Sequence, residues 1–222
     1  MVKEPRPRAR RLPADKRRQQ ILDVAIDVFA RSGYHGAGTA DIAAAAEIGE
    51  PTIYRYFESK ADLYVQAVGQ CGDRILDNWG RIVDSSENAY QAIRAIGMWY
   101  YQESRRNPEL LVLRFRTYTE SNDPEVMRIV REGYLRVKRL VEGLYERAKI
   151  EGSLRPDADT NALAWLFMAM GAIIDQTYML GIEEGEFGLP QLGGVIRIWE
   201  ASALVPEQTP DSPDVQEGAE LA

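Results

Sequence analysis

Cysteine and histidine are almost absent from this chain of 222 residues, which has one of each, Cys71 and His35. A single cysteine excludes an internal disulfide framework, and a single histidine leaves no cluster with the spacing of metal ligands. The sequence also has no glycine-rich loop of the kind that holds phosphates. We therefore expect no metal and no cofactor.

Long apolar runs are missing as well. The longest, residues 162–174, has 13 residues, whereas a helix needs about 20 to span a bilayer. The first residues, MVKEPRPRARR, are charged and lack the apolar region of a secretory signal. A cytoplasmic protein without a membrane partner is the expectation.

Acidic residues outnumber basic ones and give a net charge of -7, but the sign of the charge changes along the chain. Residues 1–66 carry a net charge of +2 and residues 67–222 carry -9. The first 18 residues alone hold eight lysines and arginines, a basic arm that favours contact with phosphates. The alternative is a solvated, disordered tail.

Strand-like alternation is absent, whereas apolar residues recur at helical spacing along nearly the whole chain. This pattern predicts an all-α fold of about nine helices. Gly33 is expected to end the first helix, and Thr39 and Ser59 are expected to cap the second and fourth. The expected helices cover residues 14–32, 39–46, a short segment with Pro51 in its first turn, a longer segment from Lys60, and residues 88–106, 108–119, 124–151, 157–181 and 189–204.

Two short helices that follow a longer one and are joined by a tight turn indicate a helix-turn-helix unit. Small and branched side chains would let these helices pack closely, namely Ile42, Ala45, Ala46, Ile48 and Ile53. The exposed face of the second short helix would offer groups that can contact phosphates, thymine methyls or base edges. These groups belong to Thr52, Tyr54, Arg55 and Tyr56.

The block TADIAAAAEIGEPTIYRYFESKADLY, residues 39–64, resembles the N-terminal signature of the tetracycline-repressor (TetR) family, and the resemblance covers residues 17–65. It implies that Thr52, Tyr54 and Tyr56 contact DNA, that Pro51 touches a base methyl, and that Lys60 and Thr39 contact the DNA backbone. The positions that carry it are Phe29, Gly33, Tyr34, Asp41, Ile42, Ala43, Ala46, Thr52, Tyr54, Tyr56, Phe57, Lys60 and Leu63.

Four positions depart from the family's usual pattern. Glu47 stands at a turn position that is commonly Gly, Gly49 where Ser or Thr commonly opens the recognition helix, and Gly38 where a Thr often precedes the first short helix. Glu50, also a candidate DNA-binding residue, begins the recognition helix with an acid. The helix dipole favours a solvated cap there, and the alternative is an acceptor for a cytosine amino group.

Three regions follow from these patterns. Residues 1–66 would form the basic arm and the helix-turn-helix DNA-binding domain. Residues 67–205 would form a helical domain for effector binding and dimerisation. Residues 206–222, with five acidic groups, no basic ones and three prolines, are expected to be a disordered tail.

The expected helix over residues 157–181 is apolar around its whole circumference, so it must be covered on both sides. The simplest second cover is another copy of the chain. With the last helix, as the family resemblance implies, it would form a four-helix homodimer interface. The candidate interface residues are Ala162, Leu166, Ala169, Ile173, Val195, Ile196 and Trp199.

Aromatic, methionine and scattered polar residues in the same region are candidates for an effector pocket, although aromatics at helical spacing are usually ordinary core. Asp175 follows 13 apolar residues and needs a partner if it is buried, such as Arg114, a ligand or a polar group across the dimer interface. The candidate set is Trp99, Arg114, Phe115, Tyr118, Trp165, Met168, Asp175, Gln176 and Tyr178.

The resemblance implies a transcriptional regulator, a repressor that a small lipophilic effector releases from palindromic operator DNA by favouring a second conformation of the body. The alternative is an all-helical enzyme acting on a small lipophilic substrate, which would have to use His35 or Cys71 without a partner. A protein-binding adaptor would leave the basic arm and the exposed face of the second short helix without a purpose.

Overall fold

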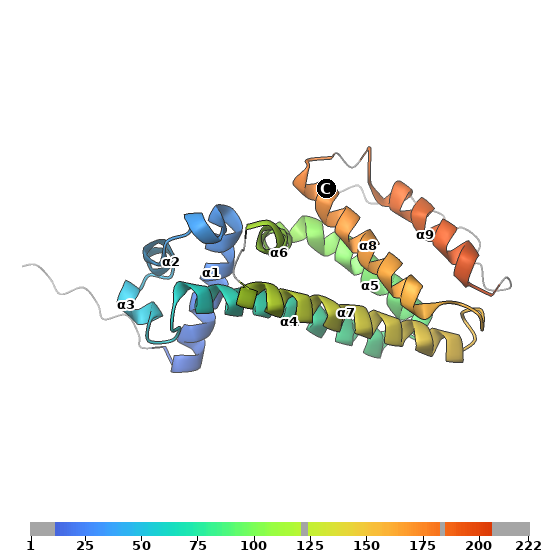
Figure 1. The fold of residues 1–222 in the computed structure, drawn as a ribbon, viewed down its shortest axis with the longest axis horizontal. Coiled ribbons are helices and arrows are strands. Elements are labelled where there is room, and N and C mark those ends of the chain that lie inside the picture. The colour runs from blue at the N-terminus through green and yellow to red at the C-terminus, as the bar shows by residue number, and fades with distance from the viewer. Residues whose placement is uncertain (1–11, 121–123, 183–184, 206–222) are drawn as a thin grey trace, which may run out of the picture. The chain divides into compact units, whose positions relative to one another are not determined.

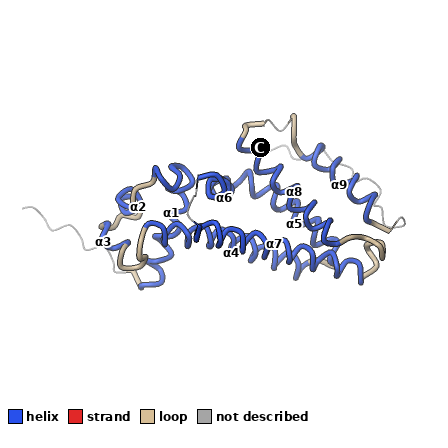
Figure 2. Tube along the Cα trace, in the orientation of Figure 1, coloured by secondary structure: helices blue, strands red, loops and turns tan. Residues whose placement is uncertain are grey.

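A computed structural model describes residues 12–120, 124–182 and 185–205. Within these ranges the chain forms nine α-helices and no β-sheet, with one isolated antiparallel bridge between Leu154 and Leu204 (Figures 1 and 2). The expectation of an all-α fold is confirmed. Residues 1–11 of the basic arm and the acidic tail over residues 206–222 lie outside the described residues.

The nine helices follow the expected order with small shifts at their ends. They are α1 (Ala14–Gly36), α2 (Thr39–Ala45), α3 (Glu50–Ile53), α4 (Lys60–Ser85), α5 (Ala89–Arg106), α6 (Pro108–Glu120), α7 (Pro124–Ile150), α8 (Thr160–Met179) and α9 (Leu189–Ala203).

The chain divides into two compact units. The first contains residues 1–78 and 103–135, and the second contains residues 79–102 and 136–222. Residue 66, where the sequence suggests a boundary, therefore falls within the first unit, in α4. Helices α4, α5 and α7 contribute residues to both units.

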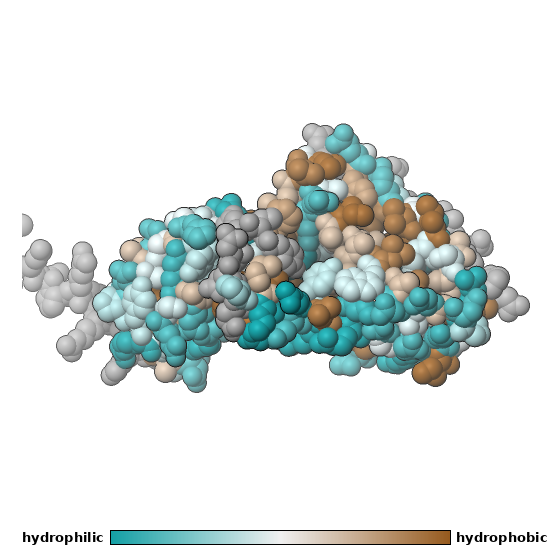
Figure 3. Space-filling view, in the orientation of Figure 1, coloured by the Kyte–Doolittle hydropathy of each residue, from teal (hydrophilic) through white to brown (hydrophobic). Residues whose placement is uncertain are grey.

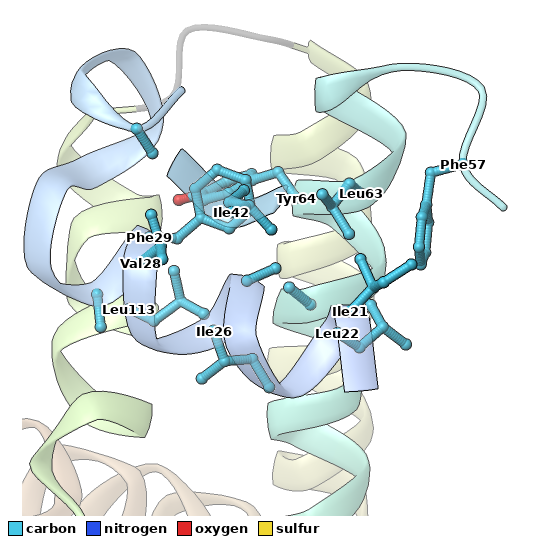
Figure 4. Packing of buried hydrophobic residues seen from close by; sticks show 14 of the residues in the cluster. Ile21, Leu22, Ile26, Val28, Phe29, Ile42, Phe57, Leu63, Tyr64 and Leu113 are labelled. Carbon is cyan, nitrogen blue, oxygen red and sulfur yellow. The ribbon is translucent and has the colours of Figure 1, made fainter. Parts of the chain in front are cut away.

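The core of the first unit is built on an apolar stripe of α1 (Figure 4). Phe29 is fully buried on this stripe, and its ring makes an edge contact with Tyr64 of α4 at 4.9 Å between centroids. The Tyr64 hydroxyl lies 2.8 Å from that of Thr117 on α6, which donates to the Leu113 carbonyl. Burial of the stripe thus holds α1 against α4 and α6.

Helix α1 changes direction at Gly33, whose φ of 69° lies in the left-handed region that glycine adopts without strain. The Ala37 amide donates to the Gly33 carbonyl at 3.1 Å and closes the turn beyond it. The prediction that Gly33 ends the regular part of the first helix is confirmed, although helical residues resume as far as Gly36.

In the second unit, α5 and α8 pack through a reciprocal pair of glycines. A Cβ atom on Gly97 of α5 would lie 3.8 Å from the Phe167 ring of α8, and one on Gly171 of α8 would lie 3.7 Å from the Tyr100 ring of α5. Each glycine thus lets an aromatic ring approach the opposite helix. Phe167 also makes an edge contact with Trp79 of α4, 5.9 Å between centroids.

Helix α9 packs against the rest of the second unit through Trp199 and Glu200, which are both buried. The Trp199 ring stacks on Tyr90 with 6.4 Å between centroids and contacts Tyr145 at 5.7 Å. The Glu200 carboxylate accepts from the Tyr90 hydroxyl and lies 3.3 Å from Nε of Arg94. Burial and the Glu200 carboxylate together raise the pKa of Tyr90, so the phenol remains a donor at neutral pH.

The turn between α2 and α3 contains a residue in a strained conformation. Glu47 has a φ of 54°, the one positive value among the described residues other than glycine. The Ile48 amide donates to the Ala43 carbonyl at 2.9 Å and the Glu47 amide to the Ala44 carbonyl at 3.1 Å. These are the two bonds of a Schellman motif, in which glycine normally occupies the position of Glu47.

We expect Glu47→Gly to stabilise the protein, because a side chain in the left-handed region costs roughly 1 kcal/mol that glycine does not incur. Urea unfolding of the full chain measures the change in the free energy of unfolding. The matched control is Ala44→Gly, at an exposed helical position of α2, which should destabilise by roughly 0.5–1 kcal/mol. A loss of stability in both variants would contradict the assignment of strain to Glu47.

Candidate functional site

Helices α2 and α3 form the predicted helix-turn-helix, with α3 reduced to a single turn. Ile42 and Ile53 are fully buried between the two helices and α1, and Ile48 of the turn packs against the same core. Pro51 lies in the first turn of α3, where its missing N–H leaves no bond unmade. The packing fixes α3 with its other face turned to solvent.

The eight residues predicted to contact DNA differ in exposure. Glu50, Pro51 and Arg55 are exposed, and Tyr54 is 50% exposed. Thr52, Tyr56 and Lys60 are half-buried, and Tyr56 also packs against the core of the first unit. Thr39 is buried, with 8% of its surface exposed.

The prediction that Thr39 caps α2 is wrong. Gly38 occupies the N-cap position, and its amide donates to the Asp41 carboxylate at 3.1 Å. The Thr39 hydroxyl instead donates to Glu50 Oε1 at 2.5 Å and lies 3.1 Å from the Tyr54 hydroxyl. A residue that the sequence placed at a helix end therefore connects α2 to α3.

These contacts give Glu50 a partner within the protein. Its carboxylate lies in the first turn of α3, where the helix dipole favours an anion, and it accepts the Thr39 hydroxyl. Neither interpretation of Glu50 from sequence included this bond, because Thr39 is 11 positions away. We call Thr39, Glu50 and Tyr54 the hydroxyl relay.

Lys60 begins α4, and two side chain to backbone hydrogen bonds cap the start of this helix. Oγ of Ser59 accepts the Asp62 amide at 3.0 Å, and the Asp62 carboxylate accepts the Glu58 amide at 2.9 Å. The prediction that Ser59 caps α4 is confirmed. The Lys60 ammonium lies over the ring of Tyr34, 4.8 Å from its centroid, a cation–π contact that holds the charge near the first turn.

Two residues of α1 also position the helix-turn-helix: Gln20, which sequence reasoning did not single out, and Arg18, the last residue of the basic arm. Gln20 donates from Nε2 to the Ala46 carbonyl at the end of α2, with 3.1 Å between the atoms. Arg18 hydrogen bonds to Gln66 and lies over the Phe57 ring at 5.3 Å. The only available signal was the match of α1 to helical spacing, which does not show what a polar side chain contacts.

The candidate effector-pocket residues are distributed over both units. Arg114, Phe115 and Tyr118 belong to the first unit and the other six to the second; the side chain of Tyr118 lies outside the described part of the chain. Trp165, Gln176 and Tyr178 are exposed, whereas Trp99, Arg114, Phe115 and Met168 are half-buried.

Asp175 is buried, and the structure provides a partner for it. The Tyr100 hydroxyl donates to Oδ1 of Asp175 at 2.6 Å, from α5 to α8 within the second unit. The carboxylate is thus hydrogen-bonded inside its own unit. Tyr100 was not among the partners considered from the sequence.

The Cys71 thiol and the Trp79 indole are two further buried groups, a candidate nucleophile and a hydrogen-bond donor. Burial raises the pKa of the Cys71 thiol to about 12, so it is protonated at neutral pH and is not an activated nucleophile. The indole of Trp79 is 3% exposed, and its Nε1 has no hydrogen-bond partner within the described part of the chain. An unsatisfied buried donor is uncommon because it costs about 1–3 kcal/mol.

One face of α8 is apolar and open (Figure 3). Ala162, Leu166, Ala169 and Ile173 follow each other at intervals of four, three and four residues, and all are exposed, with Leu166 at 40% and Ile173 at 42%. We call these four residues the α8 stripe. By length and composition alone α8 could also cross a membrane, and 28% of its most apolar stretch is buried in the protein.

On α9 the three candidate interface residues separate. Val195 is exposed and Ile196 is half-buried, whereas Trp199 lies in the interior of its own unit against Tyr90 and Tyr145. The ring of Trp199 is thus already covered by its own unit. Ile198, which the sequence prediction omitted, is 76% exposed.

Comparison with known proteins identifies the amino-terminal segment. Residues 21–67 match the model of the family described as bacterial regulatory proteins, tetR family. These residues include the core stripe of α1, both helices of the helix-turn-helix and the start of α4.

Two curated relatives are transcription factors. The chain is 35% identical over 88 residues to the HTH-type transcriptional activator FasR of Mycolicibacterium smegmatis, a match that covers 40% of each chain. It is 26% identical over 162 residues to the HTH-type transcriptional repressor KstR of Mycobacterium tuberculosis, covering 68% of this chain and 71% of the relative. The match thus spans about two fifths of the length of FasR.

The fold is shared with a solved structure, the transcriptional regulator FadR from Bacillus subtilis in complex with stearoyl-CoA. The TM-score is 0.70 at 16% sequence identity, and the match covers 83% of this chain and 97% of FadR. The family match at residues 21–67, the relatives and the helical fold agree. The amino-terminal segment of the chain is therefore similar to the tetR family of bacterial regulatory proteins over residues 21–67.

Proposed function

We propose that the protein is a cytoplasmic DNA-binding transcriptional regulator, acting as a repressor on a palindromic operator. The observation that carries the proposal is the short helix α3 and the turn after it, which a buried core holds and which present Pro51, Tyr54 and Arg55 to solvent. Lys60 adds a positive charge at the start of the next helix. The amino-terminal match to a family of regulators and the similarity to the repressor KstR support the proposal.

A homodimer is the form that we propose binds the operator. The α8 stripe combines two alanines with Leu166 and Ile173, a spacing that lets two helices approach closely, and an exposed apolar face of this kind is typical of an interface. A membrane is a poorer cover, because the opposite face of the same helix buries Asp175 against Tyr100. Two-fold symmetry would place two copies of α3 about 34–36 Å apart, as successive major grooves require.

The second unit is where we propose that a small, largely apolar effector binds. Trp79 supports this assignment, because its buried Nε1–H lacks a partner within the described residues and an acceptor on the effector would supply one. FadR, which shares the fold, was solved with stearoyl-CoA, a fatty acyl thioester with a carbonyl acceptor. An apolar molecule that carries an acceptor oxygen fits both observations.

Release of the operator would follow from a difference in effector affinity between two conformations. Helices α4, α5 and α7 supply residues to both units, so a change in their course is a physical route from the effector to α3. The effector would then act without touching the DNA-binding face.

DNA binding is tested by footprinting the region upstream of the protein's own gene across a salt series. We expect a protected site and an affinity that falls with a log–log slope near -0.9 per phosphate neutralised. Lys60→Ala should weaken binding to all sequences alike, whereas Thr52→Ala should change sequence preference. The control is Arg139→Ala, an exposed arginine of α7 in the second unit; absence of a protected site with a flat salt response would refute the proposal.

The dimer is tested by placing a charge in the α8 stripe. Because an unpaired buried charge costs several kcal/mol, Ile173→Glu should weaken the dimer at least a hundredfold, measured by sedimentation equilibrium. Ile150→Glu is the matched control, since Ile150 is 86% exposed at the end of α7 and outside the stripe. Equal effects of the two variants, or none from Ile173→Glu, would place the interface elsewhere.

The role of Trp79 is tested with stearoyl-CoA as the probe. We expect Trp79→Phe to lower its affinity about tenfold, the value of one lost hydrogen bond, as measured by calorimetry. Trp199→Phe is the control, because it removes the same ring atoms from another buried tryptophan of the second unit. If both variants bind the probe as the wild type does, Trp79 is not the donor.

A further inference from the structure

We propose that the hydroxyl relay makes α3 a reader of exocyclic amino groups, so that the operator presents a cytosine or adenine amino group to Tyr54 and Glu50 in each half-site. The proposal rests on the proposed function and specifies which base chemistry that surface recognises. It is carried by the two contacts of the Thr39 hydroxyl, at 2.5 Å to Glu50 and at 3.1 Å to Tyr54.

The positions of the protons in the relay follow from the donor capacity of each group. An ionised carboxylate can only accept, and a hydroxyl has one proton to donate. Since Thr39 donates its proton to Glu50 Oε1, the contact between Thr39 and Tyr54 requires Tyr54 to be the donor. The Tyr54 proton therefore points into the protein, toward a buried threonine.

The groups that the relay leaves open to solvent are hydrogen-bond acceptors. The Tyr54 hydroxyl keeps lone pairs on its outer side, and the Glu50 carboxylate keeps its second oxygen. Tyr54 is half-exposed and Glu50 is exposed, so both can reach a molecule placed against α3. Neither can donate to a phosphate oxygen while the relay is formed, and the Glu50 charge repels phosphate.

Base edges in the major groove offer what such a surface needs. Cytosine presents its N4 amino group and adenine its N6 amino group as donors, whereas guanine O6 and thymine O4 are acceptors. Two acceptors on one turn of helix favour the first pair and reject the second. This assignment extends the cytosine interpretation of Glu50 to a pair of residues and gives Thr39 a positioning role in place of a contact with the DNA backbone.

The test begins with selection of binding sites from a randomised duplex library by the wild-type protein. We expect a cytosine or adenine at one fixed position of each half-site, and about tenfold weaker binding when that base is replaced by an analogue lacking the amino group, 2-pyrimidinone or purine. A site with no such position, or an analogue that binds equally well, would overturn the proposal.

Variants separate the relay from a purely structural role. Thr39→Val keeps the shape but frees the Tyr54 proton, so the preference for an amino group at that position should fall about tenfold, while Thr39→Ser should restore it. Tyr54→Phe, at a half-exposed position, should bind the natural site about tenfold more weakly and discriminate less against the analogue, because only the Glu50 acceptor remains. A Thr39→Val protein with unchanged preference would show that the relay does not set it.

The free protein provides a readout that needs no DNA. A double-mutant cycle of Thr39→Val and Tyr54→Phe should be non-additive in the unfolding equilibrium constant by about fivefold, because both changes remove the same bond. Additive effects would overturn the relay itself. Coupling in this cycle together with no protected site on any DNA would leave the relay standing and refute both the regulator and its base preference.

Discussion

A helix of four residues has no stability of its own, so the proposed DNA-binding surface depends on the packing that holds α3 in place. Fixing the first helical turn is unfavourable in water, and short isolated helices do not persist. Helix α3 exists because Ile53 is buried against Ile42 and the stripe of α1 that carries Phe29. Its orientation is therefore a property of the first unit's core, and a change in that core would move every group that α3 presents.

The apolar core sets the positions of α2 and α3 approximately, and polar contacts fix them more closely. Gln20 fastens the end of α2, and the hydroxyl relay joins the start of α2 to the first turn of α3. Forming these hydrogen bonds costs little side-chain entropy where the partner is nearby and already ordered. Glu47 has the opposite effect, since the turn requires a left-handed backbone at this position, which a glutamate adopts less readily than a glycine. The unit thus tolerates one unfavourable residue because packing over-determines the turn.

Sequence was sufficient for several features whose cause lay within a few positions, although it placed the cap of α2 at Thr39 instead of Gly38. The break at Gly33, the Ser59 cap of α4 and the order of the helices depend on local spacing, so they could be predicted before any coordinates. The contacts that it missed join residues far apart in sequence, such as Tyr100 with Asp175. Periodicity shows that a residue faces inward, but it does not show which side chain meets it there. For this reason spacing alone predicts Trp199 at an interface, whereas its ring is buried within its own unit.

Helix α8 shows how one sequence pattern can hide two different surfaces. Its apolar residues surround the helix, yet the face that carries Asp175 is buried, and the α8 stripe is open. The buried face needs hydrogen-bonded polar groups to fix its register, and Tyr100 provides the partner. The open face has only small and branched side chains, which another helix can approach closely. The two faces therefore need different covers: the helix's own unit covers the first, and the dimer that we propose would cover the second.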